Sequence, residues 1–270
     1  MDLHLQSRTI VITGAASGIG RAVATAAADE GADLALLDQS PSIDQVASEL
    51  AGQFPDQHIG AARVDVTDLP QLEQTRNRLL DDGRQIDHVV HCAAIGSGRF
   101  GMPFTNLAPA DWNRVLEVNI LGMVNVAHTF APALQQQKQG SMQFLGSVAG
   151  QIGSPTDPPY SASKAAGINF AQCLARDLAP HGIRVNTICP GMVKTPLNRS
   201  VWQAWNERQE PSQQLSYDEW GQQKIRQLVP LGRWQTPEEV AATILFLLSP
   251  HAASITGQTI NVDGGYVMHW

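Results

Sequence analysis

The chain contains 270 residues, of which 43% are hydrophobic, and it carries a formal net charge of −7. The apolar content can fill a sizeable core, and the acidic balance argues against nucleic acid or an anionic membrane as the main partner. Because the three cysteines form no metal-ligand pattern, and the sequence shows no signal peptide or membrane-spanning run, we expect a reduced cytoplasmic protein without a metal.

Short apolar or β-branched runs alternate with Ala- or Leu-rich segments that have the 3.6-residue periodicity of helices. The expected strands are 8–13, 33–38, 58–64, 87–93, 141–147, 183–189 and 258–263. This alternation predicts one α/β domain over 1–270, with a doubly wound parallel sheet of about seven strands and helices on both faces. A polar, Gln-rich segment at about 196–230 interrupts the rhythm and predicts one or two inserted helices.

The first strand leads directly into a glycine loop, "TGAASGIG" at 13–20. Glycines let the backbone approach a pyrophosphate, and the N-terminus of the following helix supplies N–H donors. The spacing of Gly14, Gly18 and Gly20 is G-x-x-x-G-x-G, a variant of the G-x-G-x-x-G dinucleotide fingerprint. The loop therefore predicts a dinucleotide site, with a tight strand–helix turn as the alternative.

The second expected strand ends at Asp38, 18 residues after Gly20. A carboxylate at this place can accept hydrogen bonds from both hydroxyls of an adenosine ribose, and it repels a 2′-phosphate. No Lys or Arg lies within 14–20 or 38–45 to neutralise such a phosphate. We therefore expect NAD(H) rather than NADP(H), the alternative being an ordinary turn residue at the strand end.

The stretch "DPPYSASKAAG" (157–167) places Tyr160 and Lys164 four residues apart, on one face of a helix. Pro158 and Pro159 suit the entrance of that helix, because the first turn needs no N–H from them. Small residues between and after the pair leave the face uncrowded. Alone, the pair reads as an ordinary exposed Tyr and Lys.

Together these features resemble the compact NAD(P)-dependent oxidoreductase branch of the short-chain dehydrogenase/reductase family, over essentially the whole chain. The matching motifs are "TGAASGIG" with Asp38, "VDVTD" (64–68), Asn119 in "LEVNILG", Ser147 in "LGSVAG", "YSASK", "PGMVKTP" (190–196), "PLGRWQTPEEVA" (230–241) and "ITGQTINVDGG" (255–265). The resemblance implies a Rossmann-like fold and hydride transfer between a nicotinamide and a secondary alcohol/ketone pair.

The resemblance also implies the catalytic roles. Tyr160 is expected to be the general acid or base, and the ammonium of Lys164 to favour the phenolate and to reach the nicotinamide ribose. Ser147 is expected to hydrogen-bond the substrate oxygen as negative charge develops. Asn119 resembles the family's asparagine that holds a water in a proton relay to the lysine, although packing can also explain an Asn in a helix.

Contacts to the cofactor follow from the same resemblance. Asp65 and Val66 resemble the pair that borders the adenine, and the Val193 backbone and Thr195 are expected beside the carboxamide. The expected cofactor-binding residues are Gly14, Ser17, Gly18, Ile19, Gly20, Asp38, Asp65, Val66, Ala93, Tyr160, Lys164, Val193 and Thr195.

The chain departs from the family pattern at two places. Cys92, Ala93 and Ala94 stand where the family usually has Asn-Ala-Gly, which removes a side chain that could tie strand ends together. Gly146 stands where a second serine is common. The backbone contacts to the cofactor can survive both changes.

The substrate signal comes from the inserted segment. Trp202, Trp205 and Trp220, among many Gln, Arg and Glu, suit the C–H faces and hydroxyls of a polyol or sugar. The alternative is that these rings pack the inserted helices or a subunit interface. Asp157 either faces the pocket and binds a hydroxyl or caps the helix that follows.

The tail "GGYVMHW", which ends in Trp270, resembles the apolar tails that pack on a neighbouring subunit in this family, so we expect a homotetramer. Two other functions stay open. One is a 3-oxoacyl-thioester or other ketone reductase, which Asp38 and the acidic charge disfavour. The other is a dinucleotide-sensing binding protein, which the intact Asn119, Ser147, Tyr160 and Lys164 disfavour.

Overall fold

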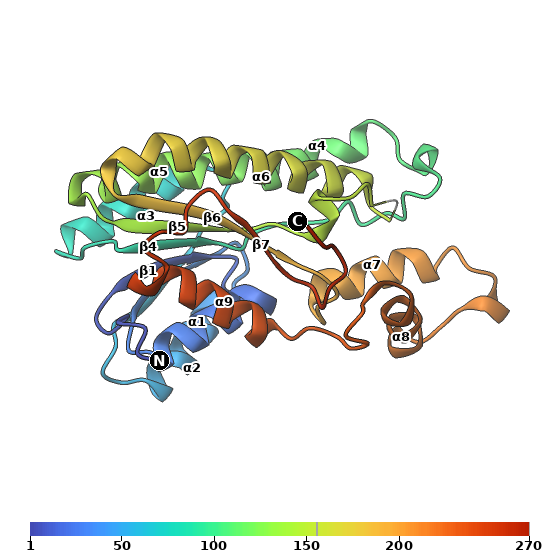
Figure 1. Ribbon diagram of the computed structural model, residues 1–270, viewed down its shortest axis with the longest axis horizontal. Coiled ribbons are helices and arrows are strands. Elements are labelled where there is room, and N and C mark those ends of the chain that lie inside the picture. The colour runs from blue at the N-terminus through green and yellow to red at the C-terminus, as the bar shows by residue number, and fades with distance from the viewer. Residues whose placement is uncertain (155, 270) are drawn as a thin grey trace.

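The computed structural model describes residues 1–154 and 156–269 (Figure 1). Its strands are β1 (Thr9–Thr13), β2 (Asp33–Asp38), β3 (Ile59–Arg63), β4 (His88–His91), β5 (Gly140–Leu145), β6 (Ile183–Pro190) and β7 (Thr259–Val262). They form one parallel sheet in the order β3-β2-β1-β4-β5-β6-β7. The expected doubly wound sheet is confirmed, and each strand lies within two residues of its predicted ends.

Helices cover both faces of this sheet (Figure 1). In the described residues the α-helices are α1 (Gly18–Asp29), α2 (Ile43–Gln53), α3 (Leu69–Asp81), α4 (Ala110–Leu116), α5 (Gly122–Gln137), α6 (Pro158–Leu178), α7 (Pro196–Asn206), α8 (Tyr217–Leu228) and α9 (Pro237–Leu248). A π-helical turn, η2 (Glu117–Leu121), joins α4 to α5. Helices α1, α2 and α9 lie on one face, and α3, α5 and α6 on the other.

The strands are apolar on both sides because each side meets a separate core. Ile10 and Ile12 of β1 pack with α1, α2 and α9, whereas Val11 between them packs with α3, α5 and α6. All three side chains are fully buried. Alternating side chains thus fill two cores, which explains the nearly continuous apolar runs in the sequence.

Helices α7 and α8 are the expected insertion over 196–230, and they extend beyond the end of the sheet (Figure 1). Both begin with a side-chain cap. Thr195 Oγ1 accepts from Asn198 N at the start of α7, and Ser216 forms a reciprocal capping box with Glu219 at the start of α8. None of the helices in the described part of the chain is both long and apolar enough to cross a membrane.

The strand order reverses between β1 and β4. The chain leaves β1 toward β2 on one side, while β4 and β5 continue on the other side. The loops after β1 and β4 therefore diverge, and a crevice opens at the carboxyl ends of these strands. Ligands of doubly wound sheets bind at this place.

Two histidines of β4 are buried within the sheet. His91 Nδ1 is 2.8 Å from Thr13 Oγ1 on β1, and His88 Nδ1 is 3.0 Å from Ser141 Oγ on β5. Each pair consists of directly opposed residues on neighbouring strands. Burial lowers the pKa of both histidines to about 3, with nearby arginines or Lys164 adding to the effect.

We expect acid to destabilise the fold through these two histidines. Above about pH 6.5, the pKa of an unperturbed histidine, neither the native nor the unfolded state binds a proton there. Below that pH the unfolded chain alone takes up protons, so the free energy of unfolding falls by about 1.4 kcal/mol per pH unit for each histidine. Urea unfolding between about pH 7 and about pH 5 measures this slope.

His91→Gln should reduce the dependence of the free energy of unfolding on pH, because it removes one of the two titrating histidines. The glutamine side chain can still hydrogen-bond to Thr13. The matched control is His128→Gln, which changes an exposed histidine of α5. Equal slopes for wild type and His91→Gln would contradict the assignment.

Candidate active site

A cavity of about 410 Å³ lies at the carboxyl ends of the strands. This volume is within the usual range of ligand pockets, about 300 to 1,000 Å³. Every residue expected to bind the cofactor lines it, and so does Ser147. Asn119 does not line it. The lining extends from Asp38 at the end of β2 to Tyr160 on α6, so it spans the strands on either side of the switch point.

The glycine loop is shaped by close approaches of backbone. Gly14 has a φ of +69°, and a Cβ on it would lie 2.7 Å from Ala93 N. A Cβ on Gly20 would lie 2.1 Å from Gly14 O. Both positions therefore exclude any side chain. Ser17 precedes α1 without making a side-chain cap, which leaves the first N–H groups of α1 for a ligand in the cavity.

Asp38 holds the glycine loop as well as facing the cavity. Its Oδ2 accepts from Ala16 N at 3.0 Å, and its Oδ1 accepts from Ser40 N at 2.9 Å. Each carboxylate oxygen can accept a further bond. The carboxylate is thus fixed in a position where ribose hydroxyls could donate to it.

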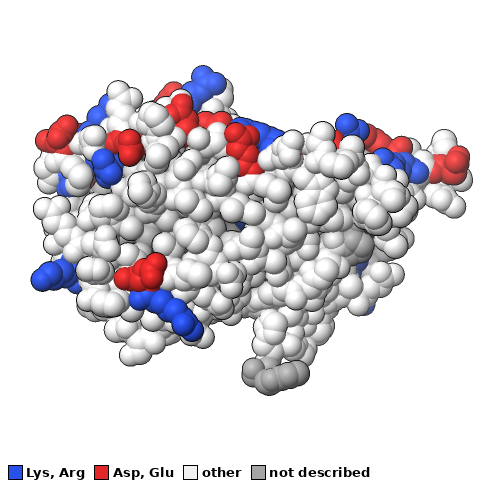
Figure 2. Space-filling view, turned by 90° about the horizontal axis from the view of Figure 1, so that it is seen from above, with Lys and Arg blue, Asp and Glu red and all other residues white. Residues whose placement is uncertain are grey.

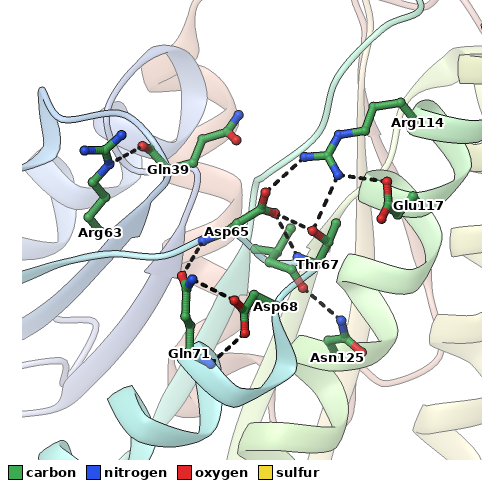
Figure 3. A network of polar contacts seen from close by, with 10 residues as sticks. Gln39, Arg63, Asp65, Thr67, Asp68, Gln71, Arg114, Glu117 and Asn125 are labelled. Carbon is green, nitrogen blue, oxygen red and sulfur yellow. Dashed lines mark hydrogen bonds and ion pairs between the residues drawn. The ribbon is translucent and has the colours of Figure 1, made fainter.

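The fold brings an arginine next to Asp38 that the sequence near the glycine loop and after Asp38 does not reveal. Arg63 pairs with Asp38 in the register of β2 and β3, and its Nε donates to Gln39 O at 3.0 Å (Figure 3). Arg63 does not line the cavity. Only the pairing of strands could reveal this neighbour, because the two residues are 25 positions apart.

The residues expected beside the adenine belong to a polar network (Figure 3). Asp65 accepts from Thr67 through Oδ1, and its Oδ2 is 3.0 Å from a guanidinium nitrogen of Arg114. Burial works to raise the pKa of Asp65, but hydrogen bonds from Thr67 and Arg114 outweigh it and leave the pKa below its usual value. Val66 O accepts from Asn125 of α5. The network fixes this wall of the cavity to α4 and α5.

Tyr160, Lys164 and Ser147 meet at the other end of the cavity. Lys164 is buried, and its Nζ donates to Leu145 O at 2.6 Å and lies 5.6 Å from the centre of the Tyr160 ring. Ser147 follows β5, and its Oγ accepts from Ala149 N at 3.1 Å. The expected juxtaposition of the phenol, the ammonium and the hydroxyl is therefore present.

In the protein by itself, burial rather than the charge of Lys164 sets the direction in which the Tyr160 pKa is shifted. Burial raises the pKa of Tyr160 to about 12, and the hydrogen bond with Ser147 only partly opposes this. Burial also lowers the pKa of Lys164 to about 8. The sequence suggested that charge attraction would dominate. In the folded protein the removal of both groups from water dominates, and each is pushed toward its neutral form.

Asn119 lies in the π-helical turn η2, and its side-chain amide makes three hydrogen bonds within the protein. Its Oδ1 accepts from Ile95 N, and its Nδ2 donates to Ile95 O and to Ser163 Oγ, all at 2.9 Å. The side chain thus ties the loop after β4 to α6. It holds the segment that forms one wall of the cavity.

Known proteins are similar to this chain over nearly its whole length. A family model described as Enoyl-(Acyl carrier protein) reductase matches residues 14–267. The chain belongs to the short-chain dehydrogenase/reductase family.

Relatives in this family act on different carbonyl and alcohol compounds. The 3-oxoacyl-[acyl-carrier-protein] reductase FabG of Thermotoga maritima is 33% identical over 267 residues, 98% of this chain and 100% of that protein. Galactitol 2-dehydrogenase of Rhizobium johnstonii is 33% identical over 265 residues, 97% of this chain and 96% of that protein. The crystal structure of L-sorbose reductase from Gluconobacter frateurii, complexed with NADPH and L-sorbose, is 26% identical, has a TM-score of 0.89 and covers 100% of both chains.

As a short-chain dehydrogenase/reductase, the protein is an NAD(P)-dependent oxidoreductase of alcohols and ketones. Its departures from the family pattern have local explanations. A Cβ on Gly146 would lie 2.6 Å from Thr187 Cγ2 and 2.7 Å from Cys189 Sγ, which leaves no room for a serine. Burial raises the pKa of the Cys92 thiol to about 12, so this cysteine is an unreactive thiol.

Of the three tryptophans of the insertion, all pack between its helices, and Trp220 also lines the cavity. In this short-chain dehydrogenase/reductase, α7 and α8 share a small core in which the Tyr217 ring contacts those of Trp202, Trp220 and Trp234. Trp220 also lines the cavity, whereas Trp202 and Trp205 do not. The sequence could not separate these roles, because all three tryptophans lie in helices among similar polar neighbours.

Several residues of the cavity escaped the sequence reasoning. Asn198 of α7, Lys224 of α8 and Tyr266 of the C-terminal segment line it. A signal was present for Lys224, which stands four residues after Trp220 and shares its helix face. Trp270, on which the expected subunit contact partly rested, lies outside the described residues.

Proposed function

We propose that the protein is an NAD-dependent dehydrogenase/reductase of a polyol or sugar, with Asn119, Ser147, Tyr160 and Lys164 as its catalytic group. One observation carries the proposal. A single cavity is lined by a carboxylate suited to ribose hydroxyls, Asp38, and by the Ser147–Tyr160–Lys164 cluster suited to moving a proton. The glycine loop, Asp65, Val66, Ala93, Val193 and Thr195 line the cavity and form the proposed cofactor site.

The residues present fit a nicotinamide dinucleotide, because the backbone cradle at Gly14 and Gly20 admits no side chain and the first turn of α1 offers N–H donors. Bound NAD⁺ supplies the hydride acceptor. Tyr160 Oη takes the hydroxyl proton as the carbinol carbon loses its hydride. In the reverse direction Tyr160 returns that proton, and the Ser147 hydroxyl stabilises the negative charge on the substrate oxygen.

Lys164 supports Tyr160 by position. Its Nζ lies 5.6 Å from the centre of the Tyr160 ring and is held in place by its hydrogen bond to Leu145 O. The ammonium is therefore positioned to stabilise the phenolate. The side chain of Asn119 acts one step further away. By holding Ile95 and Ser163 it positions the loop after β4 against α6. The water relay that the family resemblance implies for Asn119 is part of the proposal.

The preference for NAD rests on Asp38. Its carboxylate is fixed by two backbone N–H groups and cannot turn away from a 2′-phosphate without losing them. Arg63, which is paired with Asp38 across β2 and β3, could offset this repulsion, but it is exposed and its Nε already donates to Gln39 O. NADPH is bound in the L-sorbose reductase structure, so the choice of cofactor distinguishes members of this family.

A polyol or sugar is supported by the polar lining near the reacting group. Ser154, Asp157 and Asn198 line the cavity together with the Trp220 ring. The relatives that act on galactitol and L-sorbose agree with this substrate class. The second candidate is a 3-oxoacyl-thioester reductase, which the Thermotoga maritima relative favours and the net charge of −7 disfavours.

We also propose a cytoplasmic homotetramer. Figure 2 views the face covered by α5 and α6, and its middle is a broad area without Asp, Glu, Lys or Arg. Exposed apolar residues occur on these elements, among them Ala162, Ala165 and Ala166 of α6 and Leu121 of η2. Uncharged faces of this kind favour self-association.

The first prediction concerns the chemistry. NAD⁺ reduction should be seen with at least one compound of a panel of polyols, sugars, hydroxyacyl thioesters and hydroxysteroids. Tyr160→Phe should lower kcat at least about 100-fold, because it removes the general base while keeping the ring. Oxidation by the wild type should rise with pH, since burial holds the Tyr160 pKa high and only the phenolate accepts the proton. Undiminished turnover by Tyr160→Phe would contradict the assignment.

The second prediction concerns the cofactor. Wild type should use NAD⁺ at least about tenfold better than NADP⁺ in kcat/KM, and Asp38→Asn should narrow this ratio by removing the charge that repels the 2′-phosphate. Arg63→Gln is the matched control, and it should leave the NAD⁺ values unchanged. A tenfold preference of the wild type for NADP⁺ would refute the role of Asp38.

The third prediction concerns assembly. Light scattering should give a mass about four times the 29.1 kDa of one chain. Leu121→Asp, which puts a charge in place of an exposed apolar side chain next to α5, should weaken the assembly and lower the mass. A stable monomer in the wild type would refute the tetramer.

A further inference from the structure

The end of the cavity formed by α8 carries hydrogen-bonding groups that the catalytic and cofactor assignments do not use. Lys224 of α8 lines the cavity and is partly buried. No carboxylate of the described residues forms an ion pair with it, whereas Lys194 nearby pairs with Asp218 at 2.7 Å. Burial lowers the pKa of Lys224. The Lys224 ammonium is therefore free to pair with an anionic group of a ligand in the cavity.

Trp220 adds a second unused donor one helical turn before Lys224. Its side chain is 4% exposed, and the Lys224 ammonium lies 5.7 Å from the centre of its ring. The Nε1–H of Trp220 is buried and finds no acceptor among the described residues. Native proteins rarely leave such a group unpaired. Lys224 and Trp220 thus line the same end of the cavity, one helical turn apart.

A carboxylate of opposite polarity lies beside the catalytic tyrosine. Asp157 is 6% exposed and lines the cavity, and its Oδ2 accepts from Ser97 N at 2.8 Å. Its Oδ1 is buried without a hydrogen-bond partner in the described structure, and the side chain forms no cap on α6. A Cβ on Gly96 would lie 2.8 Å from Oδ2, so the absence of a side chain there lets the carboxylate seat against the loop.

These groups give the substrate end of the cavity two poles. Burial raises the pKa of Asp157, with the hydrogen bond from the Ser97 N–H opposing it, so this pole suits a hydroxyl donor and disfavours a second anion. The pole at Trp220 and Lys224 suits an anion. A ligand that satisfies both carries an acidic group at one end and hydroxyls at the other.

We propose that the substrate is a polyhydroxylated anion, such as a sugar acid or a phosphorylated polyol, whose anionic group lies against Lys224 and Trp220 and whose hydroxyl donates to Asp157. The proposal rests on the proposed function and narrows its substrate class. It also fixes the orientation of the bound substrate, because the Asp157 carboxylate repels the anionic end from the α6 side of the cavity.

The test compares neutral and anionic forms of the same carbon chain, with the full-length enzyme and saturating NAD⁺. The probes are glucitol, gluconate and glucitol 6-phosphate, with the corresponding galacto and manno series. At least one anionic probe should exceed its neutral counterpart about tenfold in kcat/KM. Added NaCl should raise KM for that probe more than for the neutral one, because salt screens the attraction to Lys224.

Lys224→Met keeps the length and apolar stem of the side chain but removes its charge. It should raise KM for the preferred anionic probe about tenfold and leave the neutral counterpart and the KM for NAD⁺ unchanged. The matched control is Arg226→Met, which removes an exposed charge from the same helix and should change none of these values. If Lys224→Met fails to fold, the salt dependence of the wild type gives the same test.

Asp157→Asn tests the other pole. The amide oxygen can still accept from Ser97, while the acceptor charge is lost, so KM should rise for neutral and anionic probes alike with the unfolding midpoint little changed. A loss of stability with KM unchanged would assign Asp157 to the helix entrance, and the hydroxyl contact would be wrong.

Three outcomes overturn the proposal and separate it from the wider function. Equal use of neutral and anionic probes, unaffected by Lys224→Met, would refute the anion while leaving a polyol dehydrogenase in place. A rise in KM for NAD⁺ with Lys224→Met would assign Lys224 to the cofactor. Turnover of a hydroxyacyl thioester and of no polyol, sugar or sugar acid would refute both the anion and the proposed substrate class.

Discussion

The site depends on a contact between two pieces of bare backbone. Gly14 of the β1–α1 loop lies against the peptide that joins Cys92 to Ala93 after β4, with no space for a Cβ between them. This contact sets the width of the crevice where the strand order reverses. Asn119 then holds the neighbouring Ile95, and through Ser163 it links the loop to the helix that carries Tyr160. A side chain at Gly14 would separate the proposed cofactor half of the site from the proposed catalytic half.

The pair formed by Tyr160 and Lys164 shows how burial and charge compete. Tyr160 and Lys164 were placed together by an i, i+4 spacing that favours attraction between a phenolate and an ammonium. Burial acts on both groups in the opposite sense and makes their charged forms less favourable than they are in water. Tyr160 therefore keeps its proton in the protein by itself. A positive charge brought next to Tyr160 would stabilise the phenolate.

Local patterns in the sequence predicted the features that depend on neighbours along the chain. The strands, the glycine loop, Asp38 and the Tyr160–Lys164 spacing are of this kind. Features that arise across strands or between helices were not predictable, because the residues are far apart in sequence. Arg63 comes to Asp38 through strand pairing, and the partners of His88 lie on β5. The tryptophans of the insertion could be separated only once α7 and α8 were seen against each other.

The small core of α7 and α8 is distinct from the two cores that flank the sheet. Its members include Trp220, which also lines the cavity, whereas the dinucleotide loop packs with the core under α1. Selection can therefore act on the two parts separately. Substitutions in the α7–α8 core can alter which alcohol is accepted while the dinucleotide half keeps its packing, so that one scaffold can diversify in substrate range at little risk to its folding.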